Sequence, residues 1–299
     1  MLTQLQIKRI LIPLDFSLTS LKAVDQAVVL AKLTKAEIIL FHVTEYLNAT
    51  TDPLYFATLP TETYESEIAK TVNDSLSKVA AKIKKKGVEK VSILAVNGRT
   101  HKEIIRASKK AKADIIIMGT HGVSGIREFV MGSNTFRVVS DAACPVLSVQ
   151  RKNKTDGFNN ILVPFSDSPH SREKVMYAIK IAQIYGAKLN ILGIDVDKTK
   201  THLKKIEFEA EQIKGIVDTY NLQSAIKVIS GAYNAKTILD YSTKVNADLI
   251  VVMGDALKQD LTEYFTGSAS QQIINHSPVP VLSVHSKINP AMMELWQAI

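Results

Sequence analysis

The stretch GTHGVSGIREFVMGSNT, Gly119–Thr135, decides how this chain folds. It follows AKADIIIM, whose three consecutive isoleucines are typical of a short strand buried on both faces of a parallel sheet. From Ser133 onward the sequence SNTFRVVSDAA has helical character, and Ser133 is a good N-cap residue. The pattern therefore predicts a strand, an open glycine-containing loop and a helix N-terminus in direct succession.

Such a loop suits a phosphate chain. Glycine lets backbone N–H groups face a ligand without a Cβ in the way, and a helix N-terminus adds roughly half a positive charge. The loop alone does not exclude the alternative that these glycines only make turns.

The pattern G-x2-G-x9-G-[S/T] in this stretch resembles the nucleotide-binding signature of the universal stress protein family, in its ATP-binding branch. The resemblance implies an adenine nucleotide, ATP or AMP, with a bound Mg²⁺ left open. Asp15, which ends the first strand, would then take the nucleoside, and backbone near His42 and Val43 would meet the adenine edge. The expected binding residues are Pro13, Leu14, Asp15, His42, Val43, Met118, Gly119, Thr120, His121, Gly122, Gly132, Ser133, Asn134 and Thr135.

The chain is an internal duplication. RILIPLDFSLTS (Arg9–Ser20) returns as NILVPFSDSPHS (Asn160–Ser171), and CPVLSV (Cys144–Val149) returns as VPVLSV (Val279–Val284). We expect one domain over residues 1–152 and a second over residues 158–299, with a polar joint between them.

Strand and helix patterns alternate in both halves, which predicts an α/β fold with a parallel sheet covered on both faces. In the first half the expected strands are Lys8–Leu14, Glu37–Val43, Val91–Val96, Ala113–Met118 and Pro145–Val149. In the second half they are Asn160–Phe165, Lys188–Val196, Ala225–Ser230, Ala247–Met253 and Pro280–Val284.

The expected architecture is two tandem doubly wound units, each a five-stranded parallel sheet. The strand order 3-2-1-4-5 is implied by the family resemblance. In that order, ligands bind beyond the carboxyl ends of strands one and four, where Asp15 and Gly119 lie.

Composition is that of an ordinary globular protein, with 46% hydrophobic and 22% charged residues and a net charge of +8. The lysine-rich runs lie at an expected helix end and at the joint, without interleaved aromatic residues, so we expect solvated charge and no nucleic-acid partner. No apolar run approaches the ~20 residues of a membrane span, and the N-terminus does not resemble a signal peptide. With a single cysteine, Cys144, we expect a cytoplasmic protein without a membrane partner.

The second half departs from the pattern. Leu257 stands where Gly122 does, and three carboxylates enter the aligned loop (Asp255, Asp260 and Glu263). Ser166 aligns with Asp15, although the acid Asp167 is adjacent. Since added bulk and like charge oppose a triphosphate, we expect the first half to bind nucleotide and the second half to have lost or altered that ability.

The leading reading is a nucleotide-binding regulatory module of the stress response. The alternative is an interaction scaffold of the same fold, and a homodimer or an unidentified protein partner stays open. GxxxxGK[ST] and metal-ligand spacings are absent, and no residue is positioned to activate His121, so no catalytic residue is assigned. We expect no enzymatic activity beyond, at most, a slow hydrolysis of ATP.

Overall fold

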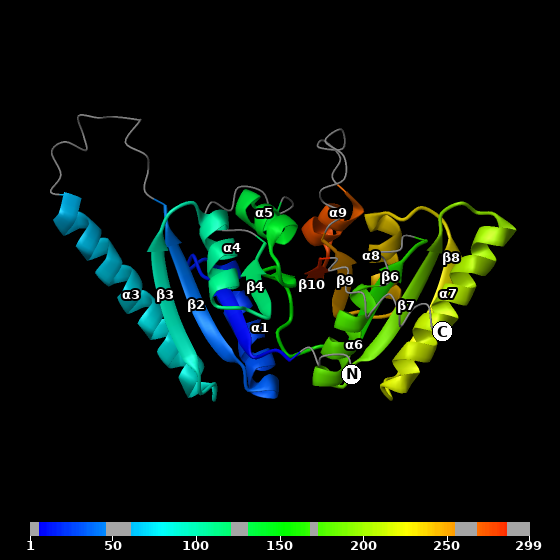
Figure 1. Ribbon diagram of the computed structural model, residues 1–299, viewed down its shortest axis with the longest axis horizontal. Helices are drawn as coiled ribbons and strands as arrows, with labels where there is room; N and C mark the ends of the chain where they lie inside the picture. Colours follow the sequence, from blue (N-terminus) through cyan, green and yellow to red (C-terminus); the bar gives the residue numbers. More distant parts are fainter. Residues whose placement is uncertain (1–5, 46–60, 121–130, 168–172, 255–267, 286–299) are drawn as a thin grey trace.

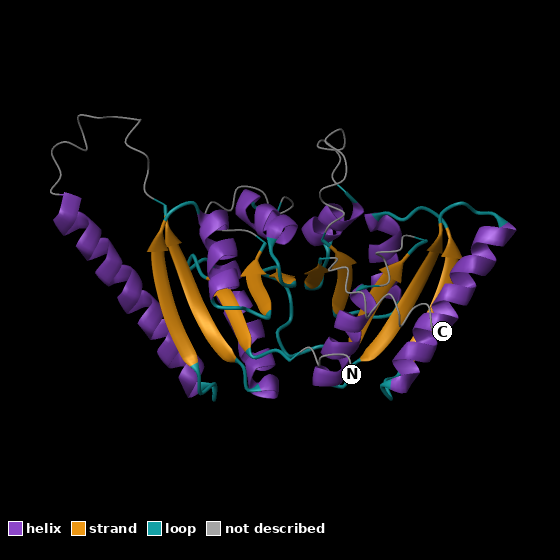
Figure 2. Ribbon diagram, viewed as in Figure 1, coloured by secondary structure: helices purple, strands orange, loops and turns teal. Residues whose placement is uncertain are grey.

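The computed structural model of the chain describes residues 6–45, 61–120, 131–167, 173–254 and 268–285. In these ranges ten strands form one sheet, flanked by helices (Figures 1 and 2). The strands of the first half are β1 (Arg9–Pro13), β2 (Glu37–Thr44), β3 (Val91–Asn97), β4 (Ile115–Gly119) and β5 (Val146–Val149). Those of the second half are β6 (Asn160–Phe165), β7 (Lys188–Asp195), β8 (Ser224–Ser230), β9 (Leu249–Met253) and β10 (Val281–Val284).

Each half has the predicted doubly wound order. The sheet runs β3-β2-β1-β4-β5-β10-β9-β6-β7-β8, so the order 3-2-1-4-5 is confirmed in the first half and repeated in the second. Pairing within each half is parallel, as the alternation of strands and helices predicts.

The two halves are joined edge to edge, which the sequence did not predict. β5 and β10 pair antiparallel, with Leu282 opposite Leu147 and Val281 opposite Ser148. Both strands read VLSV, so the pairing is self-complementary, as at a two-fold interface. It closes two short apolar edges that would otherwise expose unpaired backbone groups.

Helices cover both faces of this sheet. One face carries α1 (Leu18–Thr34), α3 (Thr61–Lys85), α6 (Lys174–Tyr185) and α7 (Lys200–Thr219), and the other carries α4 (Thr100–Lys110), α5 (Ser133–Asp141), α8 (Ala235–Lys244) and α9 (Ala269–His276). Each face has its own core, and β1 feeds both: Ile10 and Ile12 enter one layer and Leu11 the other. Burial on both faces explains why these strands are continuously apolar.

The duplication is also visible in polar detail. The Asp114 carboxylate accepts the backbone N–H groups of Lys8 and Arg9 at 2.7 and 2.8 Å, before β1. Asp248 does the same for Asn159 and Asn160 at 2.7 and 2.9 Å, before β6. In each half an aspartate that precedes the fourth strand therefore fixes the start of the first strand.

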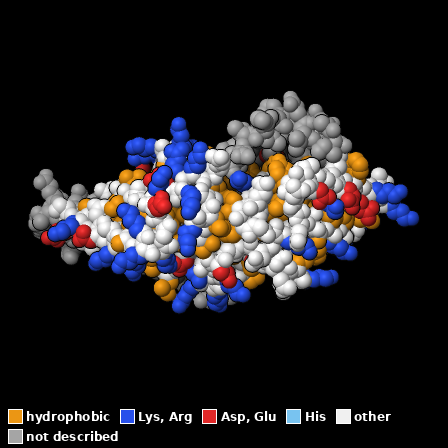
Figure 3. Space-filling view, turned by 90° about the horizontal axis from the view of Figure 1, so that it is seen from below, with side chains coloured by type: hydrophobic (Ala, Val, Ile, Leu, Met, Phe, Trp, Pro, Cys, Tyr) orange, Lys and Arg blue, Asp and Glu red, His pale blue; other side chains and the backbone are white. Residues whose placement is uncertain are grey.

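A group of basic residues lies at the end of α3. The last turn of α3 holds Lys82, Lys84 and Lys85, all exposed, and the following Lys86 pairs with Asp25 at 2.7 Å. Seen from below, basic side chains are spread over this face with acidic ones among them (Figure 3).

Candidate functional site

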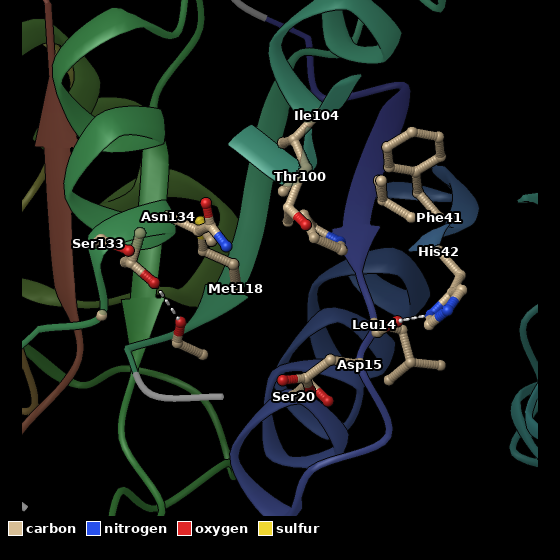
Figure 4. Close-up of a pocket in the computed structure, with 15 residues that line it drawn as sticks. Leu14, Asp15, Ser20, Phe41, His42, Thr100, Ile104, Met118, Ser133 and Asn134 are labelled. Carbon is tan, nitrogen blue, oxygen red and sulfur yellow. Dashed lines mark hydrogen bonds between the residues drawn. The ribbon is translucent and has the colours of Figure 1, made fainter. Parts of the chain in front are cut away.

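A cavity of about 220 Å³ opens at the carboxyl ends of β1, β2 and β4. This is the topological switch point of the first half, where the strand order reverses between β1 and β4. The residues around it are Pro13, Leu14, Asp15, Ser20, Phe41, His42, Val43, Thr100, Ile104, Met118, Gly119, Gly132, Ser133, Asn134 and Thr135. Figure 4 shows Ser133 and Asn134 on one side of this space and Phe41 and His42 on the opposite side.

The structure brings together all but one of the predicted site residues that it describes. The exception is Thr120, which is 1% exposed and does not line the cavity. Its N–H donates to the Val149 carbonyl at 3.0 Å, and its own carbonyl accepts the Gly132 N–H at 2.9 Å. Thr120 therefore supports the wall of the site from behind. His121 and Gly122 lie outside the described residues.

Four lining residues were missed: Ser20, Phe41, Thr100 and Ile104. Phe41 precedes His42 on β2, and Ser20 lies in the first turn after Asp15, so nearness in sequence could have indicated both. Thr100 and Ile104 come from α4, which covers the sheet beside the crevice. The signal for these two was the position of α4 directly after β3, because the helix that follows a strand begins at the ligand-binding edge of a parallel sheet.

The end of β1 is braced by His42. The Leu14 N–H donates to the Phe41 carbonyl at 2.8 Å, and the Leu14 carbonyl lies 2.7 Å from His42 Nδ1. Since a carbonyl only accepts, Nδ1 carries the proton and donates. The His42 ring also packs on Phe16, with ring centroids 5.2 Å apart. The side chain of His42 thus holds β1 and β2 in register at the cavity.

Asp15 lies at the edge of the cavity, where the sequence placed it. One of its carboxylate oxygens accepts the Ser17 N–H at 3.0 Å. Ser17 in turn caps α1, its hydroxyl accepting the Ser20 N–H at 3.1 Å. The hydrogen bond to Ser17 fixes the carboxylate beside the first turn of α1, at the cavity.

The wall opposite is the N-terminus of α5. Ser133 was predicted to be its N-cap, and this was wrong: the N-cap is Gly132, and no side chain caps the helix. Ser133 is already the first helical residue. The first-turn N–H groups of an α-helix have no partner within the helix, and here they lie at a cavity and carry the positive end of the helix dipole.

Two glycines of the site are glycines for different reasons. A Cβ on Gly119 would lie 2.8 Å from Thr19 Cγ2 and 3.1 Å from the Thr19 carbonyl carbon, so α1 could not pack on β4. A Cβ on Gly132 would meet the Thr120 carbonyl oxygen at 3.4 Å and the Thr135 hydroxyl at 4.0 Å, which are ordinary contacts. Packing explains Gly119. Neither packing nor backbone conformation requires Gly132, whose φ is −57°.

A carboxylate supports α4 at the rim. The N-cap of α4, Arg99, offers no side-chain cap, and Glu45 at the end of β2 accepts the Thr100 N–H instead, at 2.7 Å. Hydrogen bonding from the Thr100 side chain and backbone lowers the pKa of Glu45. The result is a fixed start of α4, with Thr100 and Ile104 facing the cavity (Figure 4).

The equivalent place in the second half is built differently. Phe165 stands where Leu14 does, and Gly193 stands where His42 does. A Cβ on Gly193 would lie 2.7 Å from Ile206 Cγ2 and 3.1 Å from the Phe165 ring. The aromatic ring and α7 therefore fill space next to the strand ends. The loop substitutions noted in the sequence, including Leu257, lie outside the described residues.

The helix N-terminus differs between the halves as well. Ser268 is a true N-cap of α9, its hydroxyl accepting the Gln271 N–H at 3.3 Å, whereas Ser133 at the same place in α5 is inside the helix. In the second half a protein hydroxyl thus satisfies a first-turn donor that no side chain caps in the first half.

A buried ionic cluster occupies the strand ends of the second half. Asp195 accepts the Ser230 hydroxyl at 2.8 Å and the Lys198 N–H at 3.0 Å, and it lies 2.5 Å from His202 Nδ1. The other ring nitrogen of His202 faces Asp167 at 3.4 Å. The hydrogen bond to Asp195 raises the pKa of His202. These contacts tie α7 across β6, β7 and β8.

Within the described ranges no three His, Cys, Asp or Glu residues are grouped so as to hold a metal ion. In the same part of the chain no helix combines the length and the apolar character needed to cross a bilayer.

Comparisons with known proteins agree with this architecture. The model of the universal stress protein family matches residues 6–150 and again residues 157–285. A universal stress protein of Methanocaldococcus jannaschii is 33% identical over 150 residues, which are 49% of this chain and 84% of the relative. Universal stress protein YxiE of Bacillus subtilis is 32% identical over 145 residues, 48% of this chain and 98% of the relative.

Among solved structures, a universal stress protein from Archaeoglobus fulgidus shares the fold with a TM-score of 0.75 at 24% identity, covering 95% of this chain and 98% of that one. The family model thus accounts for both halves separately, and the fold is shared along nearly the whole chain. The chain belongs to the universal stress protein family and carries two of its domains in tandem.

Proposed function

We propose that the first half binds an adenine nucleotide, ATP or AMP, and that the chain is a nucleotide-binding regulatory module of the stress response. The observation that carries the proposal is the cavity at the switch point of the first sheet, walled by an α5 N-terminus without a side-chain cap. A cavity of this kind, with convergent backbone donors, is the default place for a phosphorylated ligand in a doubly wound fold.

Each part of the nucleotide has a matching part of the wall. The first turn of α5, from Ser133 to Thr135, offers N–H groups to phosphate oxygens, and Gly132 leaves space for them. Asp15 offers carboxylate oxygens to ribose hydroxyls. The apolar side chains of Phe41 and Ile104 suit a flat base.

A magnesium ion would be held through the nucleotide. Mg²⁺ keeps several waters and is bound mainly by substrate phosphates, so it needs no cage of carboxylates. Asp15 is the carboxylate among the residues that line the cavity. We assign no catalytic residue and propose regulation by occupancy, with hydrolysis of ATP slow at most.

The second half would serve as a partner domain in which this ability is lost or altered. The Ser268 cap, the Phe165 ring and the Asp195–His202 cluster all replace features of the first cavity. Cytoplasmic location follows as part of the same proposal, because free adenine nucleotides are the ligands.

The test is direct. The purified chain is denatured and the released small molecules are analysed for adenine nucleotide, and the nucleotide-free protein is titrated calorimetrically with ATP, AMP and cyclic AMP. We expect one ATP or AMP site per chain. Binding at two sites would contradict the loss in the second half, and binding of none of the three would refute the proposal.

An interaction scaffold is the second candidate, and the fused sheet favours it. The antiparallel β5–β10 pairing already joins two domains within one chain, and β3 and β8 are left as the outer strands of the sheet. A further copy of the chain or another protein could bind there. The scaffold reading predicts no co-purified nucleotide and an oligomeric state, measured by light scattering, that is unchanged by ATP.

A further inference from the structure

The second half reaches into the wall of the first-half cavity. The side-chain oxygen of Asn275, near the end of α9, accepts the backbone N–H of Met131 at 2.8 Å. Met131 is 6% exposed and directly precedes Gly132, the N-cap of α5. A residue of one domain thus fixes the backbone that begins the proposed phosphate-binding turn of the other.

This contact closes a ring of hydrogen bonds across the seam between the halves. Gln150, which follows β5, donates its side-chain amide to the Ile274 and Asn275 carbonyls, at 3.1 Å each. Val149 accepts the N–H of Thr120, and Thr120 accepts the N–H of Gly132. From Gly132 the ring returns through Met131 to Asn275. The α5 N-terminus is therefore held from two sides, by its own sheet and by α9.

The chain segment after β5 is also fastened to the second half. Asn153 is 2% exposed, accepts the Gln150 N–H at 2.6 Å and donates to the Pro278 carbonyl at 2.8 Å. These bonds fix Gln150 in the orientation in which its side-chain amide donates to the end of α9. Because the end of α9 cannot move independently of β5, Asn275 is a rigid support for Met131.

The equivalent position of α5 carries a different side chain. Ser140 is the residue of α5 that corresponds to Asn275 of α9. It is buried, and its hydroxyl donates to the Phe136 carbonyl of its own helix at 2.9 Å. The asparagine reaches across the seam to Met131, whereas the serine hydroxyl donates within its own helix.

We propose that Asn275 is a positioning residue for phosphate binding: the second half, in place of a nucleotide site of its own, sets the backbone position at which the first half holds a nucleotide phosphate. This rests on the proposed function. The chemistry concerned is that of the phosphate groups of an adenine nucleotide, because Met131 and Gly132 lead into the α5 N-terminus. The nucleoside end, at Asp15 and His42, is held by β1 and β2 and does not touch the ring.

The experiment compares Asn275→Ala and Asn275→Leu with the wild-type chain. Leucine keeps the branched shape of the asparagine side chain, although it is larger, and removes the acceptor. Ser140→Ala is the matched control, since it removes a polar group at the equivalent helix position without touching Met131. Each protein is titrated with ATP and with adenosine, its urea midpoint is measured, and amide hydrogen exchange is followed at Met131.

Loss of one hydrogen bond changes an equilibrium constant by about three- to tenfold. We expect both Asn275 variants to bind ATP about three- to tenfold more weakly, with adenosine affinity unchanged and faster exchange at Met131. Ser140→Ala should bind both ligands as the wild type does. The split between ATP and adenosine separates positioning from general destabilisation, which would weaken both ligands alike.

Two results would overturn the inference. If the Asn275 variants bind ATP as tightly as the Ser140 control, the contact does not govern phosphate binding, and the proposed function stands. If ATP and adenosine weaken equally, Asn275 acts only on stability. A wild-type chain that binds none of ATP, AMP and cyclic AMP would refute the proposed function itself, and this inference with it, so the two failures are distinguishable.

Discussion

Replacing Gly132 or Gly119 by alanine adds one methyl group to the same cavity wall, and the structure predicts opposite consequences. At Gly132 the backbone has φ −57° and ψ 143°, which any residue adopts, and the added Cβ has no neighbour closer than 3.4 Å. Alanine is a poorer N-cap than glycine, but it also lowers the entropy of the unfolded chain. These small opposing effects should leave the free energy of unfolding within about 1 kcal/mol of the wild type.

At Gly119 the same methyl group collides with α1. The Cβ would lie 2.8 Å from Thr19 Cγ2, closer than real contacts allow, and 3.1 Å from the Thr19 backbone carbon, which is tighter than most real contacts. Thr19 is a buried residue of the first turn of α1, so the helix must shift. Overpacking of this kind costs about 1–3 kcal/mol, and we expect Gly119→Ala to lose that much stability.

Nucleotide binding should respond in the reverse order of stability. A methyl group at Gly132 occupies space that we assign to phosphate, so Gly132→Ala should bind ATP at least tenfold more weakly, which corresponds to about 1.4 kcal/mol. Calorimetric titration with ATP gives the affinity, and urea unfolding followed by circular dichroism gives the stability. Normal ATP affinity in Gly132→Ala would refute the assignment of the cavity, and wild-type stability in Gly119→Ala would refute the packing argument.

Three further predictions concern stability. Burial lowers the pKa of Lys174 to about 7, so the unfolded chain binds the extra proton between pH 7 and the ordinary lysine pKa. Stability should therefore rise with pH above 7 by about 1 kcal/mol per unit from this group, and Lys174→Met should remove the slope, measured by urea unfolding at several pH values. The hydrogen bond to Asp195 raises the pKa of His202, so its contribution is full below the unfolded pKa and is lost as pH rises through the folded value. His202→Gln should accordingly lower the melting temperature more at pH 6 than at pH 9, and an equal loss at both would contradict a charged His202. Ser17→Ala removes the cap of α1 and should cost about 1 kcal/mol in a urea titration, a loss that Ser17→Asp should largely avoid.

Much of the fold is written locally in the sequence. The isoleucine run before Gly119 predicts a buried strand because side chains on both faces of a parallel sheet must be apolar. The hydroxyl residues Ser17 and Thr19 both predict the start of α1, because either hydroxyl can satisfy a first-turn N–H, and in the structure Ser17 does so. The family resemblance supplied the strand order, and together these placed Asp15 and Gly119 at one crevice, where the structure has them.

The N-terminus of α5 could not be predicted from the neighbouring residues alone. Ser133 and Ser268 each follow a glycine at the same place in the repeat, yet only Ser268 caps its helix. Serine can serve either as a cap or as a first helical residue, and the choice depends on where the chain enters the helix. The entry to α5 is fixed by Thr120 and Asn275, which lie far from Ser133 in sequence or across the seam.

The sequence by itself therefore determined the succession of strands and helices and the duplication. It also determined those cavity residues that lie at strand ends or in the glycine pattern. Only the tertiary structure decided that β5 and β10 merge the halves into one sheet, that α4 supplies Thr100 and Ile104, and that Thr19 rather than a ligand demands Gly119. The reason is that strand and helix patterns arise from contacts between residues a few positions apart. The pairing of edge strands and the close packing of a helix on a strand depend instead on distances between elements, which a local periodicity does not contain.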